Sequence, residues 1–327
     1  MLVESLAREL AARGCEVDTV FLPFSWNDRV GLLKSALAWR LIDLTEVAGH
    51  RVDRVIATRF PSYLIKHPNK VVWLVHQLRQ AYDLLGTAHS DFQPADARER
   101  ALLDTVRAMD RRTLGEARRL FSISANTAER LRRFNQLEAE VLYPPPKLAA
   151  ALRPGEPGDY IFSLGRLDPM KRFDLLIRAL KHCTAPVRVK LAGSGPERDS
   201  LAALAQKLGV AERVELLGWA DDRTVLDAYA SCLGVFYAPY DEDYGYVTVE
   251  AFQAGKPVLT TSDAGGVLEF VEDGINGFVC PPDAPQQMAA RMDTLFGDRE
   301  RARALGEAGR AKVAKIGWDG VVEKLLG

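Results

Sequence analysis

The sequence predicts an α/β protein built from two parallel-sheet domains in series. Its 327 residues are enough for about two domains of ordinary size. Short apolar strands alternate with helical segments along most of the chain, a pattern typical of βαβ units and a parallel sheet. Three prolines at 144–146, followed by a Pro- and Gly-rich stretch at 154–158, interrupt this alternation. Because consecutive prolines stiffen the backbone, we expect the linker between the domains there.

Composition narrows the class of protein. The chain is 47% hydrophobic and 27% charged, as expected for a soluble chain with a sizeable core. Its formal net charge of −1 argues against bulk nucleic-acid binding. The four cysteines form no C-x-x-C pair and are typical of reduced thiols in a cytosolic protein, and the histidines form no zinc-binding pattern. We therefore expect a cytoplasmic protein without a metal site, and peripheral contact with a membrane stays open.

The first half begins with apolar residues at helical spacing in 2–13, followed by Gly14 where a helix would end. A helix that feeds a strand is an unusual opening for a parallel sheet, which normally starts with a strand and a glycine-rich turn. Further helices are expected at 29–47, 94–118 and 127–134, and strands at 17–22, 52–58, 71–75 and 119–124.

The second half restarts the alternation after the prolines. Strands are expected at 160–164, 187–192, 214–217, 233–238, 257–261 and 277–279, and helices at 172–181, 197–208, 222–230 and 247–254. Ligands of such sheets bind at the carboxyl ends of the strands, so the residues just after each strand are the candidates for chemistry.

Cations follow the first strand of this half. In the turn from Gly165 to Arg172, Arg166 and Lys171 stand before a helix, where basic side chains and a helix N-terminus together can neutralise a diphosphate. A solvated basic helix start is the plainer alternative. After the next strand, Gly193-Ser194-Gly195-Pro196 lets the backbone approach a ligand closely, but it is not the dinucleotide fingerprint.

Two glutamates, Glu242 and Glu250, stand eight positions apart, one in a loop and one in the helix that follows. Glu250 lies in an otherwise apolar stretch, and burying an unpaired carboxylate is costly, so we expect a partner or a role for it. Gly245 allows the intervening backbone to turn its N–H groups toward an anion. A further glycine-rich turn follows at 262–266.

These motifs carry a resemblance to glycosyltransferase family 4, the retaining group 1 enzymes of the GT-B fold. It spans about residues 158–283 and rests on SLGRLDPMKRFDLLIRAL, LAGSGPE, LLGWADD, EDYGYVTVEAFQAGKPVLTT and DAGGVLEFVEDGINGFVCPPD. The resemblance implies two Rossmann-like parallel-sheet domains facing across a cleft. It also implies net retention at the anomeric carbon and a nucleotide-diphosphate sugar as donor, with no metal and no further cofactor.

The resemblance also implies roles for single residues. Arg166 and Lys171 resemble the pair that holds the donor diphosphate, Glu242 the acid that faces the transferred sugar, and Glu250 the acid that binds the ribose. Around them the donor site would be completed by Gly165, Gly193, Leu217, Gly218, Gly245, Tyr246 and Val247, of which Leu217 and Gly218 fall where the family seats the base.

The first half resembles the family more weakly. His76 follows a strand where such enzymes often place a histidine near the reacting sugar; a purely structural histidine is the alternative. The family opens with a strand and a glycine-rich loop, and the sequence begins at the helix that should follow them. We expect an acceptor-side domain at 1–150 lacking that strand, a nucleotide-sugar domain at 151–310, and a C-terminal helix at 311–327 that packs on the first domain.

The resulting hypothesis is transfer of a sugar to a glycan, lipid-linked or small-molecule acceptor, in cell-surface polysaccharide biosynthesis. A non-catalytic nucleotide-sugar-binding subunit and a nucleotide-sugar epimerase on the same fold remain alternatives. A phosphorylase is disfavoured because no pyridoxal-binding lysine site is evident, and a dinucleotide-dependent oxidoreductase because the fingerprint is absent. Neither the donor base, the sugar, the acceptor nor the oligomeric state follows from the residues.

Overall fold

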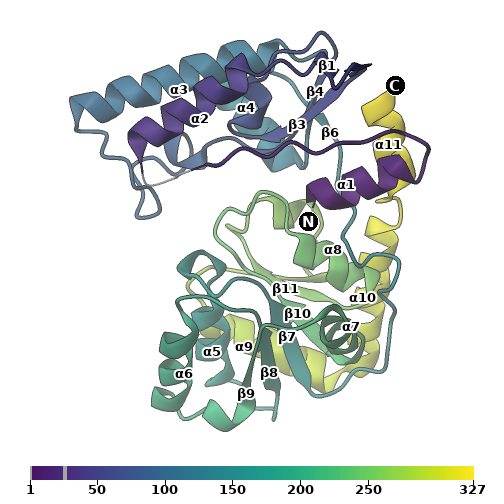
Figure 1. The fold of residues 1–327 in the computed structure, drawn as a ribbon. Helices are drawn as coiled ribbons and strands as arrows, with labels where there is room; N and C mark the ends of the chain where they lie inside the picture. The colour runs from purple at the N-terminus through teal and green to yellow at the C-terminus, as the bar shows by residue number, and fades with distance from the viewer. Residues whose placement is uncertain (1, 25–27) are drawn as a thin grey trace. The chain divides into compact units, whose positions relative to one another are not determined.

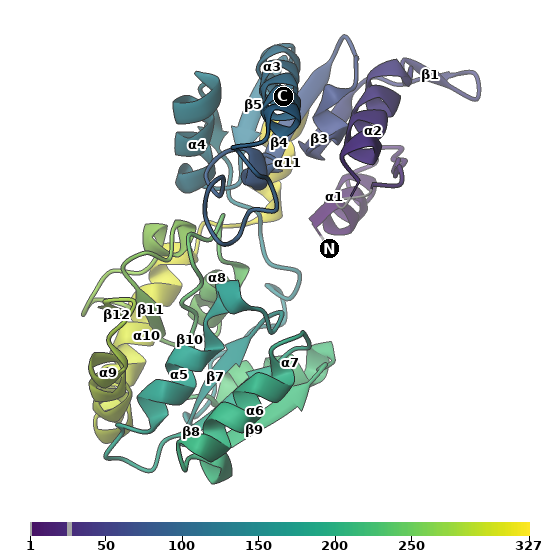
Figure 2. The same cartoon turned by 90° about the vertical axis from the view of Figure 1, so that its left-hand side faces the viewer.

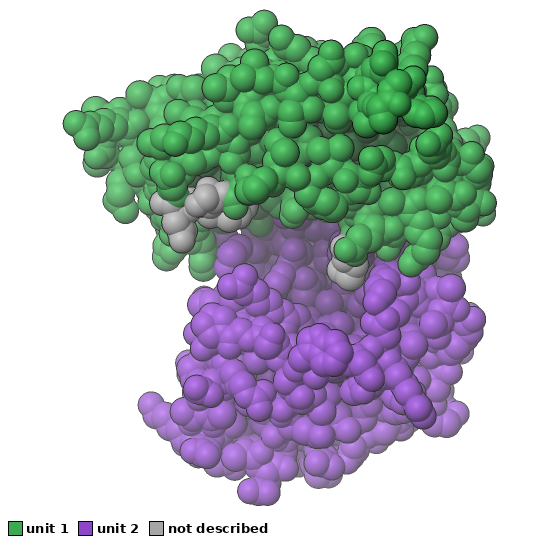
Figure 3. Space-filling model, viewed as in Figure 1, with its two compact units in different colours: residues 1–144, 318–327 green, residues 145–317 purple. Residues whose placement is uncertain are grey.

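The structure is a computed structural model that describes residues 2–24 and 28–327. The chain divides into two compact units, coloured separately in Figure 3. Unit 1 comprises residues 1–144 and 318–327, and unit 2 comprises residues 145–317. The boundary therefore lies after Pro144, earlier than the expected 150. The C-terminal segment of unit 1 begins at Trp318, later than the expected 311.

Unit 2 is built on a six-stranded parallel sheet in the order β12-β11-β10-β7-β8-β9. Its strands are β7 (Tyr160–Leu164), β8 (Arg188–Ala192), β9 (Val214–Gly218), β10 (Gly234–Phe236), β11 (Val258–Thr261) and β12 (Gly277–Cys280). Read from β9, the order along the chain is third, second, first, fourth, fifth, sixth, which is the doubly wound arrangement with its switch point between β7 and β10. The expected strands of this half are thus confirmed, and their carboxyl ends share one edge.

Helices connect these strands (Figures 1 and 2). They are α5 (Phe173–Leu180), α6 (Arg198–Lys207), α7 (Asp222–Ser231), α8 (Tyr246–Gln253), α9 (Pro285–Gly297) and α10 (Arg299–Val313). The main core of the unit joins apolar side chains of α5, α6, α9 and α10 to those of the central strands, with Leu176, Val189 and Phe236 fully buried. Helices α9 and α10 were not predicted; Pro285 in the first turn of α9 is the signal that marks its start.

Unit 1 holds a four-stranded parallel sheet in the order β3-β4-β5-β6. The strands are β3 (Val55–Arg59), β4 (Lys70–His76), β5 (Arg119–Ser122) and β6 (Glu140–Val141). Its helices are α1 (Leu2–Ala11), α2 (Arg29–Leu41), α3 (Ala97–Gly115), α4 (Ala125–Asn135) and α11 (Trp318–Leu326). Residues of α2, α3 and β4 form its core, in which Val72 and Leu74 are fully buried.

The prediction of a strand at 17–22 is wrong. These residues have no assigned secondary structure and belong to no sheet. They border a cavity of about 1140 Å³ that β3 borders as well. A segment with the apolar pattern of a strand forms one only where a partner backbone lies about 4.8 Å away. None of the described strands pairs with this segment.

The helix predicted at 29–47 ends earlier, at Leu41. Asp43 stops it, because its carboxylate accepts hydrogen bonds from the Thr45 N–H at 2.8 Å and the Thr45 hydroxyl at 2.6 Å. Such local side-chain bonds compete with helix formation. Beyond this turn, β1 (Glu46–Val47) and β2 (His50–Arg51) form a small antiparallel pair.

The last helix, α11, packs within unit 1. The ring of Trp318 meets that of Trp73 edge to face, with centroids 6.3 Å apart. Arg119 donates a hydrogen bond of 2.6 Å to the carbonyl of Lys324, and Arg54 donates to that of Leu325. The end of the chain is thereby tied to strand β5 and to the residue just before β3.

Among the described residues, no helix combines the length and the apolar character needed to cross a bilayer.

Candidate functional site

Three of the predicted glycines lie together at the carboxyl ends of β7, β8 and β9. The Gly165 N–H donates to the Ala192 carbonyl at 3.0 Å, and the Gly193 N–H donates to the Gly218 carbonyl at 2.7 Å. Gly193 has φ +137°, and a Cβ there would stand 1.8 Å from the Gly165 carbonyl oxygen. Only glycine fits at 193, so the turns after β7 and β8 approach each other backbone to backbone.

Lys171 and Glu242 meet directly, although 71 residues separate them in the sequence. Lys171 Nζ donates to Glu242 Oε2 and also lies 3.2 Å from the Tyr237 hydroxyl, which itself donates to Glu242 Oε2 at 2.9 Å. The side chains of Lys171 and Glu242 are 21% and 19% exposed, so this cluster is open to a ligand from one side. We name Lys171, Tyr237 and Glu242 the cation cluster.

Arg166, the other predicted cation, extends into solvent. Its side chain is 74% exposed, and Asp168 is its nearest carboxylate, at 3.8 Å. It starts from the same turn as Lys171 but does not join the cation cluster. A long guanidinium so weakly held can reorient toward an anionic ligand.

The backbone of Glu242 is held by the loop that follows β11. The Glu242 N–H donates to the Ala264 carbonyl at 3.2 Å, and the Gly266 N–H donates to the Glu242 carbonyl at 2.8 Å. Gly245, with φ +85°, turns the chain into α8. Tyr246 and Val247 open that helix, and their N–H groups have no acceptor within it. The predicted backbone donors therefore stand at the start of α8, a few residues from Glu242.

Glu250 is buried on α8, with 8% exposure. Its Oε2 accepts a hydrogen bond of 2.8 Å from the hydroxyl of Tyr229 on α7. Burial raises the pKa of Glu250 to about 7, against the opposing effect of the Tyr229 hydrogen bond. The expected partner of this carboxylate is therefore Tyr229, and its charge is poised near neutral pH.

Arg172 connects two loops of the site, although no separate role was predicted for it. Its guanidinium donates to the carbonyls of Ala238 and Pro239 at 2.8 and 3.0 Å and to both oxygens of Asp263 at 2.8 and 2.9 Å. Burial alone would raise the pKa of Asp263, but the Arg172 hydrogen bonds lower it below its usual range. Arg172 thus joins the loops after β10 and β11.

Tyr237, Tyr229, Arg172 and Asp263 were missed as functional residues. Tyr237 directly follows a strand at the carboxyl edge of the sheet, which is a signal that could have found it. Tyr229 could not be found in this way, because it approaches Glu250 from a neighbouring helix.

Leu217 and Gly218 end β9, where the site reaches the edge of the sheet. Both are half-buried, and Gly218 adopts φ +70°. The guanidinium of Arg198, in the first turn of α6, lies beside Gly218. At this end of the site, the backbone of Gly218, which carries no side chain, therefore lies next to the positive charge of Arg198.

His76 lies in unit 1, as the last residue of β4. Its Nδ1 stands 2.7 Å from the carbonyl of Gln77. A carbonyl only accepts, so Nδ1 donates the proton of this hydrogen bond, and the other ring nitrogen, Nε2, is not part of it. His76 also borders the cavity next to β3.

Within the described part of the chain, no group of three His, Cys, Asp or Glu side chains is placed to hold a metal ion.

Residues 146–312 match the family described as glycosyl transferases group 1. A D-inositol 3-phosphate glycosyltransferase of Nocardia farcinica is 30% identical over 283 residues, covering 78% of this chain and 61% of that relative. An uncharacterized glycosyltransferase of Methanocaldococcus jannaschii is 32% identical over 169 residues, covering 51% of this chain and 43% of that protein. The chain thus spans about three fifths of the length of the first relative.

Solved structures share the fold at low identity. Sucrose-phosphate synthase from Thermosynechococcus elongatus superposes with a TM-score of 0.77 at 18% identity, covering 99% of this chain and 90% of that one. WaaG, a glycosyltransferase involved in lipopolysaccharide biosynthesis, has a TM-score of 0.71 at 20% identity and covers 98% and 93%. HepE of Anabaena, solved with UDP-glucose, has a TM-score of 0.63 at 21% identity and covers 92% and 76%. With its Rossmann-like units of the GT-B fold, the chain belongs to the group 1 glycosyl transferases.

Proposed function

We propose that this protein transfers a sugar from a nucleotide-diphosphate sugar to a glycan, lipid-linked or small-molecule acceptor, with retention and without a metal or other cofactor. The observation that carries the proposal is the cation cluster: Lys171 held by Glu242 and Tyr237 beside the glycine turns of β7 and β8. A lysine ammonium at that place can neutralise the charge that builds on a departing diphosphate. The relatives named glycosyltransferases support the reaction class.

The donor would lie along the carboxyl edge of the sheet of unit 2. In this proposal Leu217 and Gly218 seat the base, and Glu250 accepts hydrogen bonds from the ribose hydroxyls. The diphosphate would meet Lys171, Arg166 and the N–H groups of Tyr246 and Val247. At the close turns of Gly165 and Gly193 the diphosphate would meet bare backbone, because neither residue carries a side chain. The solved complex of HepE with UDP-glucose supports a donor of this chemical class.

Glu242 has two tasks in this proposal. It holds Lys171 in place, and its remaining carboxylate oxygen can accept a hydroxyl of the transferred sugar. His76 is proposed to hydrogen-bond a further sugar hydroxyl through Nε2, the ring nitrogen that does not contact Gln77. Leaving-group stabilisation by fixed cations and backbone dipoles would then replace a metal ion.

Isothermal titration with a panel of nucleoside diphosphates and their sugars, in the presence of a chelator, tests the donor site. We expect micromolar binding of one nucleotide that is lost in Glu250→Ala. Failure of the whole panel to bind would overturn the donor assignment.

A second assay separates the reaction from its alternatives. Once the donor that binds is known, sugar transfer is assayed by measuring the release of nucleoside diphosphate in the presence of candidate acceptors. Binding without any release would favour a non-catalytic subunit, and an isomerised nucleotide sugar would favour an epimerase. The anomeric configuration of the product, read by NMR, tests retention.

A further inference from the structure

Helix α2 of unit 1 is apolar on two opposite faces. Leu32, Ala36 and Trp39 face the core and are 1%, 1% and 8% exposed. On the other face, large aliphatic side chains recur every three or four residues and are exposed to solvent. These residues, the outer face of α2, are Val30, Leu33, Leu37 and Leu41, exposed by 57%, 38%, 56% and 73%.

Such a stripe requires an explanation. Residues spaced by three or four lie on one side of a helix, so the four side chains form one continuous apolar strip. A surface helix normally shows water a polar face, and a contiguous exposed apolar patch marks an interaction site. Among the described residues, nothing covers the strip.

The unpaired charge beside the strip is positive. Helix α2 contains Arg29, Lys34 and Arg40 and no acidic residue, but Arg29 pairs with Glu99 and Arg40 with Glu116. Lys34 is exposed and forms no ion pair within the described part of the chain. This ammonium beside four exposed aliphatic side chains suits an anionic partner with an apolar layer.

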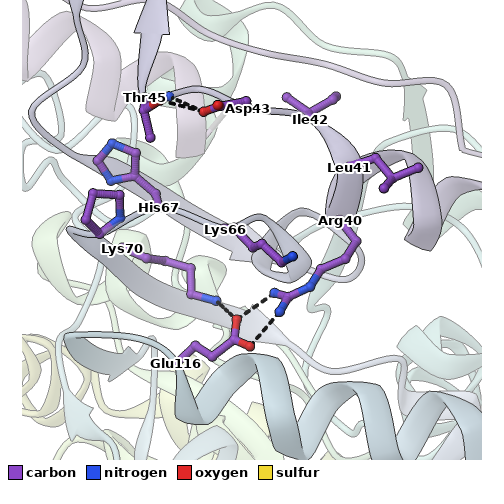
Figure 4. A pocket seen from close by; sticks show the side chains of 10 residues that line it. Arg40, Leu41, Ile42, Asp43, Thr45, Lys66, His67, Lys70 and Glu116 are labelled. Carbon is purple, nitrogen blue, oxygen red and sulfur yellow. Dashed lines mark hydrogen bonds and ion pairs between the residues drawn. The ribbon is translucent and has the colours of Figure 1, made fainter.

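A cationic pocket adjoins the end of the strip (Figure 4). It has a volume of about 620 Å³ and shares Leu41 with the outer face of α2. Glu116 accepts two hydrogen bonds of 2.6 Å from Arg40 and lies 3.5 Å from the buried Lys70. Figure 4 shows the side chain of Lys66 beside that of Arg40. Three cations thus face two carboxylates, those of Glu116 and Asp43, and the pocket keeps an excess positive charge.

We propose that the outer face of α2 docks on a lipid surface with anionic headgroups. The four aliphatic side chains would enter the boundary of the acyl chains, with the helix lying in the plane of the surface. Lys34 and the pocket of Arg40 and Lys66 would then stand at the level of the phosphates, where each Lys or Arg adds to the attraction.

A second copy of the chain fits this face less well. In a two-fold contact the same patch meets itself, so α2 would lie against α2. Lys34 would then approach a second α2 that offers it no acidic residue, and the two Lys34 ammonium groups would repel each other. An anionic lipid surface supplies the opposite charge and an apolar layer at once.

This proposal goes beyond sugar transfer and does not depend on it. The test is flotation of the full chain with vesicles of phosphatidylcholine alone and of equal parts phosphatidylcholine and phosphatidylglycerol. We expect binding to the anionic vesicles that weakens as salt is added. Leu33→Ser with Leu37→Ser should lower partition at least about tenfold, because two leucines no longer leave water.

Two further variants separate the contributions. Lys34→Glu with Lys66→Glu should also lower binding about tenfold or more, since it reverses two charges near the surface. Ile275→Ser, an exposed aliphatic residue of unit 2 at 58%, is the matched control and should bind like the unchanged chain. Nucleotide titration should be the same in all variants, so loss of vesicle binding is distinguishable from failure of the donor site.

Three results would overturn the proposal. They are absence of flotation with anionic vesicles, equal flotation of Leu33→Ser/Leu37→Ser and the unchanged chain, and a dimer in sedimentation velocity that this double variant dissociates. The last result would assign the outer face of α2 to a second copy. Because none of the four aliphatic side chains belongs to the core cluster of unit 1, circular dichroism should show that the variants fold.

Discussion

Lys171 illustrates how one residue acquires its role from its neighbours. In the sequence it is one of three basic residues before a helix, a position where lysines are often simply exposed to solvent. In the fold, its ammonium sits between the Tyr237 hydroxyl and the Glu242 carboxylate, both from a loop more than 60 residues away. Ordering a lysine side chain lowers its conformational entropy. The two hydrogen-bond partners order it before any ligand binds, so less entropy is lost on binding.

Removing this ammonium should impair the chemical step. We expect Lys171→Ala to lower kcat/KM for the nucleotide sugar about 100-fold or more, the range seen when one leaving-group or oxyanion donor is lost. Arg166→Ala should cost less, because that side chain is 74% exposed and weakly held. Lys181→Ala, an exposed lysine of the same unit, is the control. Unchanged kcat/KM in the Lys171→Ala and Arg166→Ala double variant would rule out the diphosphate assignment.

Glu250 predicts a dependence on pH. Burial raises its pKa from 4.5 to about 7. Between these values the folded chain keeps a proton that the unfolded chain has lost, so the stability of unit 2 should fall as pH rises from about 4.5 to 7 and then level off. Glu250→Gln should reduce this slope, measured by thermal melts at several pH values, and leave the part that comes from Asp110 in unit 1. A slope that persists unchanged in Glu250→Gln would contradict the assignment.

The same carboxylate should make nucleotide binding pH-dependent. An ionised carboxylate binds ribose hydroxyls more strongly than the acid does, so affinity should rise about fivefold as pH passes through about 7. Asp110 on α3 of unit 1 is the matched comparison, because burial also raises its pKa to about 7. Asp110→Asn should alter the pH dependence of stability and leave the nucleotide titration unchanged. Loss of the affinity change in Asp110→Asn, rather than in Glu250→Gln, would argue against the ribose role.

At the scale of elements, the site depends on turns that bring strand ends together. The turn after β8 reaches the turn after β7 because Gly193 has no Cβ, and Arg172 joins the loops after β10 and β11 through their carbonyls and Asp263. Adjacent parallel strands lie about 4.8 Å apart, so their carboxyl ends gather residues distant in sequence. The doubly wound order places β7 and β10, which precede Lys171 and Glu242, side by side.

Gly193→Ala tests this arrangement. The new Cβ would overlap the Gly165 carbonyl oxygen, and φ +137° is strained for any L residue. We expect a loss of about 3 kcal/mol or more in the unfolding free energy of unit 2, measured by denaturant titration, together with weaker nucleotide binding. Gly297→Ala is the control, since no atom lies within 4 Å of its added Cβ. Equal stability of the two variants would refute the close approach of the turns.

At the scale of the whole molecule, the chain returns to its first unit at the end. Val321, Val322 and Leu325 of α11 are 2%, 3% and 0% exposed, and Trp318 packs on Trp73 of β4. Unit 1 is therefore completed by residues that follow all of unit 2. The apolar surface that residues 318–327 bury therefore stabilises the fold of residues 1–144.

Leu325→Ala should destabilise unit 1 by about 2–4 kcal/mol, because a fully buried leucine leaves a cavity. Hydrogen exchange should then speed up in β4 and β5, whereas β7 and β8 should keep their protection. Leu326→Ala, at an exposed neighbour, should have little effect. Faster exchange in unit 2 alone would contradict the assignment of α11 to unit 1.

The sequence alone determined the alternation of strands and helices in unit 2, the linker region near the prolines, and the residue types at the strand ends. These features are local, since periodicity, glycine and proline act over a few residues. Tertiary structure decided the rest. Residues 17–22 have a strand pattern but no partner strand among the described ones, Tyr229 reaches Glu250 from another helix, and Arg172 bonds to loops more than 60 residues away. Pairing, burial and hydrogen bonding across such separations depend on where the chain folds back, which no local pattern encodes.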